Sequence, residues 1–397
     1  MSRLISVLVL VVCFGGFAWG ADLPPVDRKP PGAEGSGVTE AVTKEEEGLD
    51  DFSFDAFRDL VLGRTTVRGA LSAGYSYNLA DPEQHRGGNA LRLSDPDHNS
   101  FALTHAVLGL ERRVDPNSDV DVGYGLDLTV GRVVDEAYDD GLLQSRGIAV
   151  GQAYVDLKTP LFGGMKFRAG KEYGWFGLDS VDLSRNFHQS LSYAALSAPR
   201  TLVGVSAEIE LLDGVTYAQY LVNGSDLAID DNDAKSLAGR LRLASDRGSL
   251  TLSYMLGADR FDSEGELSWI AEAVATYQLT DTLSVGGLVR VGQEEVNGSV
   301  REFGLLEAQA RVSLFDGLLH LGARASVLHD EDGMITGRDQ SLFEITATAE
   351  LRLAEQFGVG AEFRHDESSE DDAFGGSRGA ATRSSQDTLS FFVRVRF

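Results

Sequence analysis

Charged residues in the middle of the chain are spaced so that they could face one another across a narrow aqueous gap. Asp179, Asp182 and Arg185 lie in a stretch, residues 175–200, that lacks the regular alternation of its surroundings. Basic residues on alternating segments could form the opposite side: Lys166, Arg168, Arg240, Arg242, Arg394 and Arg396. Opposed charges across such a gap create a transverse field that orders water and favours small hydrophilic solutes over apolar ones.

We take these nine residues as candidates for the lining of a constriction. The hypothesis requires residues 175–200 to fold inward, so that Asp179 and Asp182 face Lys166, Arg168, Arg240 and Arg242. The alternative is an external lid in which the two carboxylates are merely solvated. The sequence leaves both arrangements open.

Catalytic and metal-binding patterns are weak. The seven histidines, His85, His98, His105, His188, His320, His329 and His365, are scattered, and none follows a G-x-S-x-G elbow or pairs with another at metal spacing. The pairs His329–Asp330 and His365–Asp366 could form dyads only through the fold. We therefore predict no enzymatic activity, no cofactor and no metal centre.

One acidic stretch could supply calcium ligands. Asp226, Asp230, Asp231 and Asp233 offer carboxylate oxygens, but the stretch lacks the glycine and terminal glutamate of an EF-hand loop. An ordinary solvated loop is the favoured interpretation.

The elements that must position the charged residues are strands with one apolar and one polar face. Around residues 119–130, every second residue is apolar, and Asp, Gly and Thr fill the gaps. Period two indicates a strand. Similar runs of about ten residues, the length that a tilted transmembrane strand needs, cover residues 203–211, 250–256, 267–279, 283–291, 319–327, 343–353 and 389–397. The segments near Phe101 and Thr216 alternate poorly, and their faces cannot be assigned.

The connections fall into two classes by length. Short turns rich in Asp, Asn, Gly and Pro lie at residues 115–118, 159–164, 213–214, 245–248, 280–282, 316–317 and 354–356. Long polar loops lie near residues 79–100, 133–146, 175–200, 223–235, 259–266, 293–302, 328–340 and 366–386. Seven short turns alternating with eight long loops predict sixteen strands, with fourteen to eighteen as the range.

The predicted fold is an all-β transmembrane, antiparallel, up-and-down barrel with short periplasmic turns and long external loops. A soluble sandwich or solenoid would also alternate. However, sixteen strands with one charged face cannot close around a dry core, and the fixed repeat of a solenoid is absent.

The N-terminal region predicts export. Arg3 precedes an apolar run to Phe17, followed by small residues, which indicates a signal peptide over residues 1–20 with cleavage near Ala21. Residues 21–62 are expected to form an acidic linker, rich in Pro and Gly, on the periplasmic side with one candidate short helix, and the barrel would cover 63–397. The only cysteine, Cys13, lies inside the signal, so no disulfide is predicted.

Composition excludes two classes of protein. The formal net charge is −26, which would repel nucleic acid phosphates. After the signal there is no second long apolar run, so a helical membrane protein is excluded.

The last strand and the middle of the chain resemble a known family. The chain ends DTLSFFVRVRF, and a terminal Phe397 after an alternating strand is similar to the signature that outer-membrane assembly machinery recognises. The segments GQAYVDLKTPLFGGMKFRAGKEYGWFGLDS, SRNF and YAQYLVNGSDLAIDDNDAKSLAGRLRL, within residues 150–245, resemble the β-barrel porin family described as OmpL-like. The resemblance implies a channel in the bacterial outer membrane without specifying its solute.

The sequence as a whole predicts a porin for passive diffusion of small hydrophilic solutes or ions. Acidic loops would make the mouth electronegative, and because salt screens that field over about 8 Å, only a mild cation preference is expected. The expected partners are outer-membrane lipid and lipopolysaccharide, the assembly machinery through Phe397, and the solutes. A homotrimer stays open. The alternatives are a non-conducting adhesin or structural barrel and, with less support, an outer-membrane hydrolase.

Overall fold

The computed structural model describes residues 63–82, 88–138, 147–230, 232, 234–258, 266–375 and 381–397. Contacts within the chain separate residues 1–63 from residues 64–397, and the second unit forms a barrel. The expected signal peptide (1–20) and nearly all of the expected linker with its short helix (21–62) lie outside the described residues.

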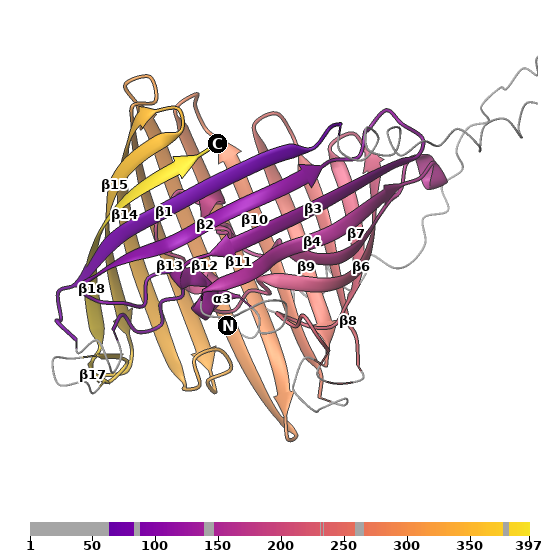
Figure 1. Ribbon diagram of the computed structural model, residues 1–397. Coiled ribbons are helices and arrows are strands. Elements are labelled where there is room, and N and C mark those ends of the chain that lie inside the picture. The colour runs from indigo at the N-terminus through magenta and orange to yellow at the C-terminus, as the bar shows by residue number, and fades with distance from the viewer. Residues whose placement is uncertain are drawn as a thin grey trace, which may run out of the picture. The chain divides into compact units, whose positions relative to one another are not determined.

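Sixteen antiparallel strands close into one barrel (Figure 1). They are β1 (Thr66–Asn78), β2 (Ser100–Arg112), β3 (Asp121–Val130), β4 (Ile148–Lys158), β5 (Lys166–Tyr173), β6 (Thr201–Leu212), β7 (Val215–Val222), β8 (Ser236–Ala244), β9 (Gly248–Gly257), β10 (Ser268–Gln278), β11 (Leu283–Val296), β12 (Ser299–Leu314), β13 (Leu319–Glu331), β14 (Gln340–Ala354), β15 (Phe357–Ser368) and β18 (Ser385–Arg396). Each strand pairs with its neighbours in sequence, and β18 pairs with β1 to complete the ring. The predicted fold and strand number are confirmed.

Few residues lie in other elements. The two short strands β16 (Phe374–Gly375) and β17 (Ala381–Arg383) form a hairpin in the connection between β15 and β18. Helical turns occur at α3 (Arg132–Ala137), η2 (Leu161–Gly163), η3 (Leu183–Arg185) and η4 (Tyr193–Ala195). Among the described residues, no helix is long and apolar enough to cross a bilayer.

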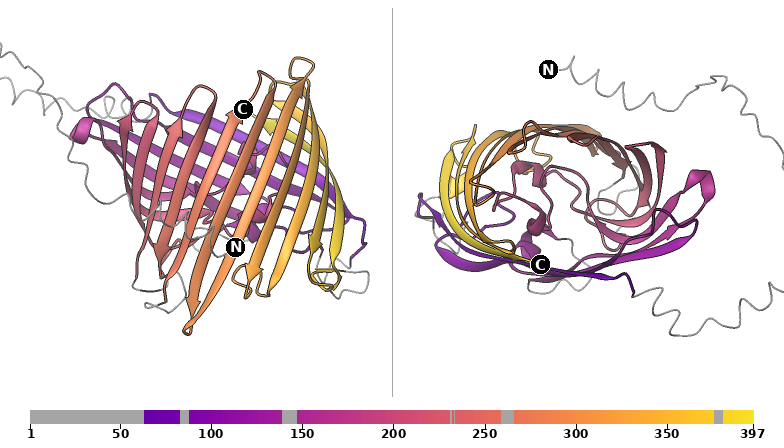
Figure 2. Two further views of the ribbon diagram at one scale, coloured as in Figure 1. Left: turned by 180° about the vertical axis from the view of Figure 1, so that it is seen from behind. Right: turned by 90° about the horizontal axis from the view of Figure 1, so that it is seen from above.

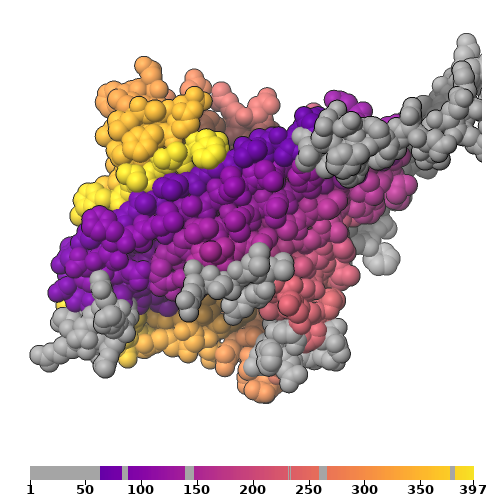
Figure 3. All heavy atoms as spheres, in the orientation of Figure 1, coloured from indigo at the N-terminus to yellow at the C-terminus, as the bar shows by residue number. Residues whose placement is uncertain are grey.

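The strands bury their polar face and expose their apolar face. On β3, Val122, Leu126 and Leu128 are 41–45% exposed, whereas Asp127 is 1% exposed and Thr129 is fully buried. This is the reverse of a soluble sheet, and it follows because lipid contacts the outside of the wall and polar groups line the inside. Figure 3 shows the continuous outer surface that β1 to β4 present.

All seven predicted short turns occur at one end of the barrel, and most connections at the other end are longer. The expected long loop at 293–302 is wrong, because β11 continues to Val296 and β12 begins at Ser299. Asn297 and Gly298 alone connect them, both at positive φ (51° and 77°). Asn-Gly is the pair that such two-residue hairpins favour, and the strands therefore extend as a longer hairpin.

The two segments without clear alternation have local explanations. In β2 the register against β1 shifts at Ser72, and Thr104 and His105 are both buried, so one bulge breaks the period. In β7, Gln219 follows the outward parity of Tyr217, but Tyr217 and Tyr254 hydroxyls donate to its side-chain oxygen at 2.6 and 2.8 Å. A polar residue is thus satisfied on an otherwise apolar face.

Candidate functional site in the barrel lumen

The connection between β5 and β6, residues 174–200, lies inside the barrel; we call it the inner loop. Its side chains and backbone contact lumen-facing side chains of β1, β2, β10, β11, β13, β14, β15 and β18. The view along the barrel in Figure 2 shows this segment within the ring of strands. Long-range contacts of this kind place the inner loop in the lumen rather than outside as a lid.

Four buried arginines connect the wall to the backbone of the inner loop. Arg290 (β11), Arg324 (β13), Arg364 (β15) and Arg394 (β18) are each 0–5% exposed and lie on the lumen face of their strands. Each forms an ion pair with wall carboxylates. Arg290 pairs with Glu272, and Arg324 pairs with Glu344. Arg364 pairs with Glu344 and Asp366, and Arg394 pairs with Glu350. Each also donates to an inner-loop carbonyl, those of Ala194, Ser190, Leu191 and Phe187.

Two wall carboxylates complement these arginines by accepting from loop amides. Glu362 accepts from the amides of Gln189 at 2.7 Å and Ser190 at 2.9 Å, and Glu272 accepts from the amide of Gly177 at 2.9 Å. Buried charges are costly unless they are paired and hydrogen-bonded. Because the inner loop satisfies both signs of wall charge with its backbone, loop and wall depend on each other.

Apolar side chains fill the space around the inner loop. Leu183 and Leu191 pack with Val133 and Val134 of α3 and with Tyr173. On the other side, Tyr193 and Ala194 pack in a cluster with strand residues of β10 to β14 and Phe374 of β16. A third cluster joins Phe176 and Ala198 to β6, β7, β8 and β9. The inner loop is therefore fixed within the lumen by packing as well as by ion pairs.

The first external loop adds to this arrangement. Arg92 forms ion pairs with Asp95 and, at 3.1 Å, with Asp366 on β15, and its side chain is 1% exposed. The Ser94 hydroxyl accepts from the amide of Leu191 at 3.0 Å. Residues 88–99 thus contact both the wall and the inner loop.

The two acidic residues predicted for the constriction are both buried in ion pairs. Asp179 pairs with Arg324 at 2.8 Å, and Asp182 pairs with Arg68 at 3.0 Å and Arg185 at 3.1 Å. Burial raises the pKa of Asp179 even though Arg324 opposes the shift. For Asp182 burial acts in the same direction, but the Ser184 hydrogen bond and the surrounding positive groups outweigh it, so its pKa is lowered.

Three of the four wall bases predicted to face these acids have other partners and the fourth is exposed, so the predicted pairing is wrong. Lys166 and Arg240 pair with Glu208 at 2.7 and 2.9 Å, and Arg168 pairs with Asp156 and Glu172. Arg242 lies two residues beyond Arg240 toward the short turn and is exposed. The reason is geometric: the inner loop places Asp182 next to Arg68 of β1 and Asp179 next to Arg324 of β13.

The remaining predicted residues lie on different sides of the inner loop. Arg185 is 51% exposed on its side chain and stacks on the Tyr173 ring at 5.3 Å. Arg394 is 5% exposed and lies between wall and loop, where it donates to the Phe187 carbonyl at 2.7 Å. Arg396 donates to the Asn186 carbonyl at 3.3 Å. Of these three, Arg185 is the most exposed.

A cavity of about 620 Å³ lies beside the inner loop, against the wall from β1 to β8; we call it the lumen cavity. Its charged and aromatic lining consists of Arg68, Glu111, Arg113, Tyr154, Arg168, Glu172, Tyr173, Trp175, Phe176, Asp179, Arg185 and Arg240. A second cavity of about 420 Å³ shares Leu178, Asp179 and Arg185 with it and extends to Asp246 and Arg247 at a short turn. The tip of the inner loop therefore lies between the two open spaces.

Several lining residues escaped prediction. Glu111 lies near the end of β2, Arg113 follows that strand, and Trp175 lies two residues after the end of β5. Arg68 forms an ion pair with Asp182, and nothing in its local sequence indicates a partner 114 residues away. Parity identifies a face; it does not identify contacts across a lumen.

The other chemical candidates are not assembled by the fold. His329 contacts Ser341 while Asp330 binds Thr336, and His365 contacts Asp387 at 2.8 Å rather than Asp366. Asp226 accepts from Arg200 and Asp230 pairs with Lys235, whereas Asp231 and Asp233 lie outside the described residues. In the described part of the chain, no group of three or more His, Cys, Asp or Glu side chains is arranged to hold a metal ion.

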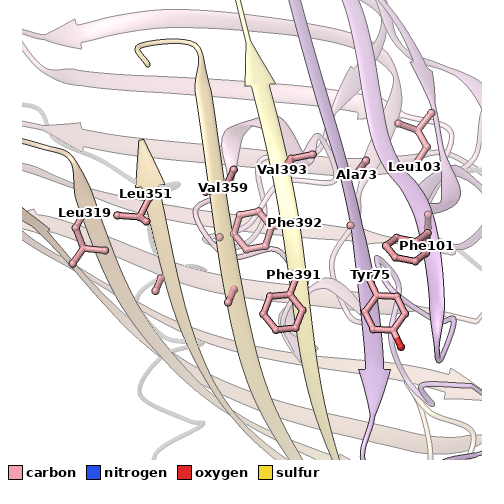
Figure 4. Close-up of a pocket in the computed structure, with 15 residues that line it drawn as sticks. Ala73, Tyr75, Phe101, Leu103, Leu319, Leu351, Val359, Phe391, Phe392 and Val393 are labelled. Atoms are coloured by element: carbon pink, nitrogen blue, oxygen red, sulfur yellow. The ribbon is translucent and has the colours of Figure 1, made fainter. Parts of the chain in front are cut away.

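The outer wall carries an apolar hollow of about 880 Å³ where β13, β14, β15, β18, β1 and β2 adjoin (Figure 4). Small residues, Ala102, Ala349, Gly360 and Ala361, form part of its lining. Large side chains that Figure 4 labels, among them Tyr75, Phe101, Leu351 and Phe391, complete it. Its exposed side chains, such as Phe101, Leu351 and Phe391, lie on the lipid-facing side of the wall.

A closed sixteen-strand barrel with an apolar exterior, a charged interior and a connection folded into its lumen is the architecture of an outer-membrane porin. The family described as putative beta-barrel porin-2, OmpL-like, matches residues 64–397, and the chain belongs to this family. The protein is therefore a barrel of the bacterial outer membrane. No curated protein has a matching sequence.

Solved structures share the fold at low sequence identity. The anion-selective porin from Comamonas acidovorans superposes with a TM-score of 0.58 at 10% identity, over 84% of this chain and 99% of that one. The outer-membrane channel DcaP of Acinetobacter baumannii gives 0.56 at 10% identity, over 84% and 97%. OmpT of Vibrio cholerae, an outer-membrane protein solved in trimer form, gives 0.56 at 12% identity, over 84% and 99%. Such identities support the common barrel and no finer property.

Proposed function

We propose that the protein is a porin that admits small hydrophilic solutes and ions by passive diffusion, and that the inner loop sets the size limit. The lumen cavity, bordered on one side by the inner loop and on the other by polar wall residues, carries this proposal. A barrel of sixteen strands encloses more space than its own side chains fill. With the inner loop in place, the remaining passage is narrow and polar.

Liposome swelling with neutral sugars of increasing size tests the size limit. Monosaccharides should enter vesicles that contain the purified protein, and entry should fall steeply for larger oligosaccharides. Equal entry of all sizes would contradict a constriction by the inner loop, and no entry of any sugar would contradict the porin function.

For ions we propose a mild cation preference that originates at the external mouth. The long loops hold most of the acidic surplus behind the net charge of −26. Their field attracts cations but is screened over about 8 Å at physiological salt. Reversal potentials across a planar bilayer under a KCl gradient measure the preference, and a clear anion preference would contradict this assignment.

A non-conducting structural or adhesive barrel is the second candidate. The observation in its favour is the packing around the inner loop, where three apolar clusters fill part of the lumen. Such a protein would give no swelling and no current steps. A hydrolase has less support, since neither candidate dyad is formed: His329 contacts Ser341 rather than Asp330, and His365 contacts Asp387 rather than Asp366.

We propose three further partners. Phe397 would be read by the outer-membrane assembly machinery, and the acidic external loops would bind lipopolysaccharide through divalent ions. A homotrimer, the form in which OmpT of Vibrio cholerae was solved, would use the apolar hollow of Figure 4 as part of its contact surface. Mass measurement of the detergent-solubilised protein tests this, and Ala361→Trp should lower the trimer fraction if the hollow is in contact. A monomer in mild detergent would contradict the trimer.

A further inference from the structure

We infer that the lumen cavity is a binding subsite for small organic acids, in which Arg185 of the inner loop and Arg240 of β8 bind the carboxylate. The inference rests on the proposed porin function and specifies a solute class for it. Five arginines and three acidic residues line the cavity, which gives its surface a surplus of positive charge. The surplus is opposite in sign to that of the whole chain.

Three arginines at the cavity are more exposed than the carboxylates with which they pair, and in the fourth pair, Arg240 and Glu208 at 25% and 24%, only Arg240 lines the cavity. Arg68 is 25% exposed on its side chain, whereas its partners Asp127 and Asp182 are 1% and 0% exposed. Arg185 is 51% exposed beside the same buried Asp182. Arg168, at 20%, likewise exceeds its partner Asp156, at 6%. A solute in the cavity therefore meets guanidinium groups before it meets the carboxylates behind them.

Aromatic rings hold three of these guanidinium groups by their faces. Arg168 lies over the Tyr154 ring at 3.5 Å, Arg185 over Tyr173 at 5.3 Å, and Arg240 over Trp175 at 5.4 Å. A guanidinium stacked in this way keeps its N–H edge available for hydrogen bonds in the plane. The stacking fixes the arginines at low entropic cost before any solute arrives.

Arg185 and Arg240 retain unused donors. Arg185 donates from Nε to Asp182, and Arg240 donates from Nη2 to Glu208 at 2.9 Å. An arginine has five N–H donors, and within the described part of the chain no further acceptor contacts these two side chains. Arg168, by contrast, binds Asp156 with two nitrogens and Glu172 with a third. The first two arginines can therefore bind an added carboxylate.

Such a site would bind weakly, as permeation requires. Conduction needs a site that is favourable enough to enter and weak enough to leave, and exposed ion pairs are worth little in water. The mouth can still favour small cations over chloride, because bulk ion preference and binding of a particular anion are different quantities.

Block of single-channel current by succinate tests the inference. Purified full-length protein in a planar bilayer should show a KCl current that succinate reduces in a saturable manner, while the same concentration of sucrose does not. Arg185→Gln with Arg240→Gln should raise the half-blocking concentration by at least about fivefold, the factor equivalent to one exposed ion pair. Arg383→Gln, which removes an exposed charge on β17 outside the lumen, should leave it unchanged.

The outcomes separate the two proposals. A conducting channel that succinate does not block, or that is blocked equally in the double variant, would overturn the subsite and leave the porin function intact. Absence of current steps in the wild type would overturn the porin function itself. Heat-dependent gel mobility confirms that each variant is a folded barrel, and recovery of block in Arg185→Lys with Arg240→Lys would support a role for positive charge.

Discussion

Replacement of Arg324 by methionine removes a fully buried cation that connects wall and inner loop. Its Nε donates to Glu344 at 2.6 Å, and its Nη1 donates to Asp179 at 2.8 Å and to the Ser190 carbonyl at 2.8 Å. Methionine fills a similar volume without charge, so the loss is mainly electrostatic. Two carboxylates would stay buried with one cation fewer.

The expected cost falls on the lumen-bound state of the inner loop. Removal of one partner from a buried ion pair costs about 3–5 kcal/mol. Because Asp179 and Ser190 become solvated when the inner loop leaves the lumen, most of that cost is relieved in the released state. The released population should therefore rise by roughly a hundredfold to a few thousandfold, at 1.36 kcal/mol per factor of ten. Arg290, Arg364 and Arg394 still hold the inner loop, so the lumen-bound state should stay the majority.

Trypsin cleavage after Arg185 measures the released population. The cleavage rate follows that population when release and return are fast relative to cleavage, so the rate at this bond should rise by the same factor in the Arg324→Met variant. Arg311→Met is the matched control: it also removes a lumen arginine, but Arg311 contacts the inner loop by stacking on the Phe187 ring at 5.4 Å, so the rate should rise much less. Cleavage after Arg185 at the wild-type rate in the Arg324→Met variant would refute the reasoning.

Three further predictions concern the inner loop and the closing strand. Burial lowers the pKa of His188 to about 3, and Arg324 adds to this shift. When the inner loop leaves the lumen, His188 regains its ordinary pKa near 6.5 and can be protonated below that pH, whereas in the lumen it stays neutral. Acidification from pH 7 to pH 5 should therefore disfavour the lumen-bound inner loop by about 2 kcal/mol. The time spent in a wider conducting state should increase accordingly, and His188→Gln should remove that pH dependence; an equal pH response in the variant would count against it. Gly322→Ala places a Cβ against the Phe187 ring and should speed cleavage after Arg185, whereas Gly304→Ala, where a Cβ has open space, should not; equal rates would show that the ring moves freely. Deletion of Phe397, whose amide and carbonyl pair with Gly69 at 2.9 Å each, should lower the amount of heat-modifiable barrel in outer membranes several-fold, and unchanged amounts would contradict its role in closure.

The fold could be predicted because period two is a local property. Val122, Leu126 and Asp127 show their faces within a few residues, and short turns such as that at Asp213–Gly214 have a recognisable composition. The two-residue hairpin at Asn297–Gly298 is not predicted because β11 and β12 are polar near that end. Both faces of the hairpin contact water there, so its residues need not alternate between apolar and polar. Strand extension there depends on backbone pairing, which composition does not reveal.

The site could be predicted only in part, because its contacts join residues that are far apart in sequence. Asp179 was a candidate from the sequence, but its partner Arg324 lies 145 residues away. The carbonyls that Arg290 and Arg394 bind carry no side-chain signal at all. The direction in which the inner loop folds does not follow from local pattern either, since its lumen position depends on the summed contacts with strands around the barrel.

Single-channel recording in planar bilayers tests the central claim most directly. If the lumen holds an aqueous passage beside the inner loop, the purified protein should produce uniform ohmic steps, and the Arg324→Met variant should add larger or noisier ones. A folded, heat-modifiable barrel that inserts into the bilayer and gives no steps would contradict the account.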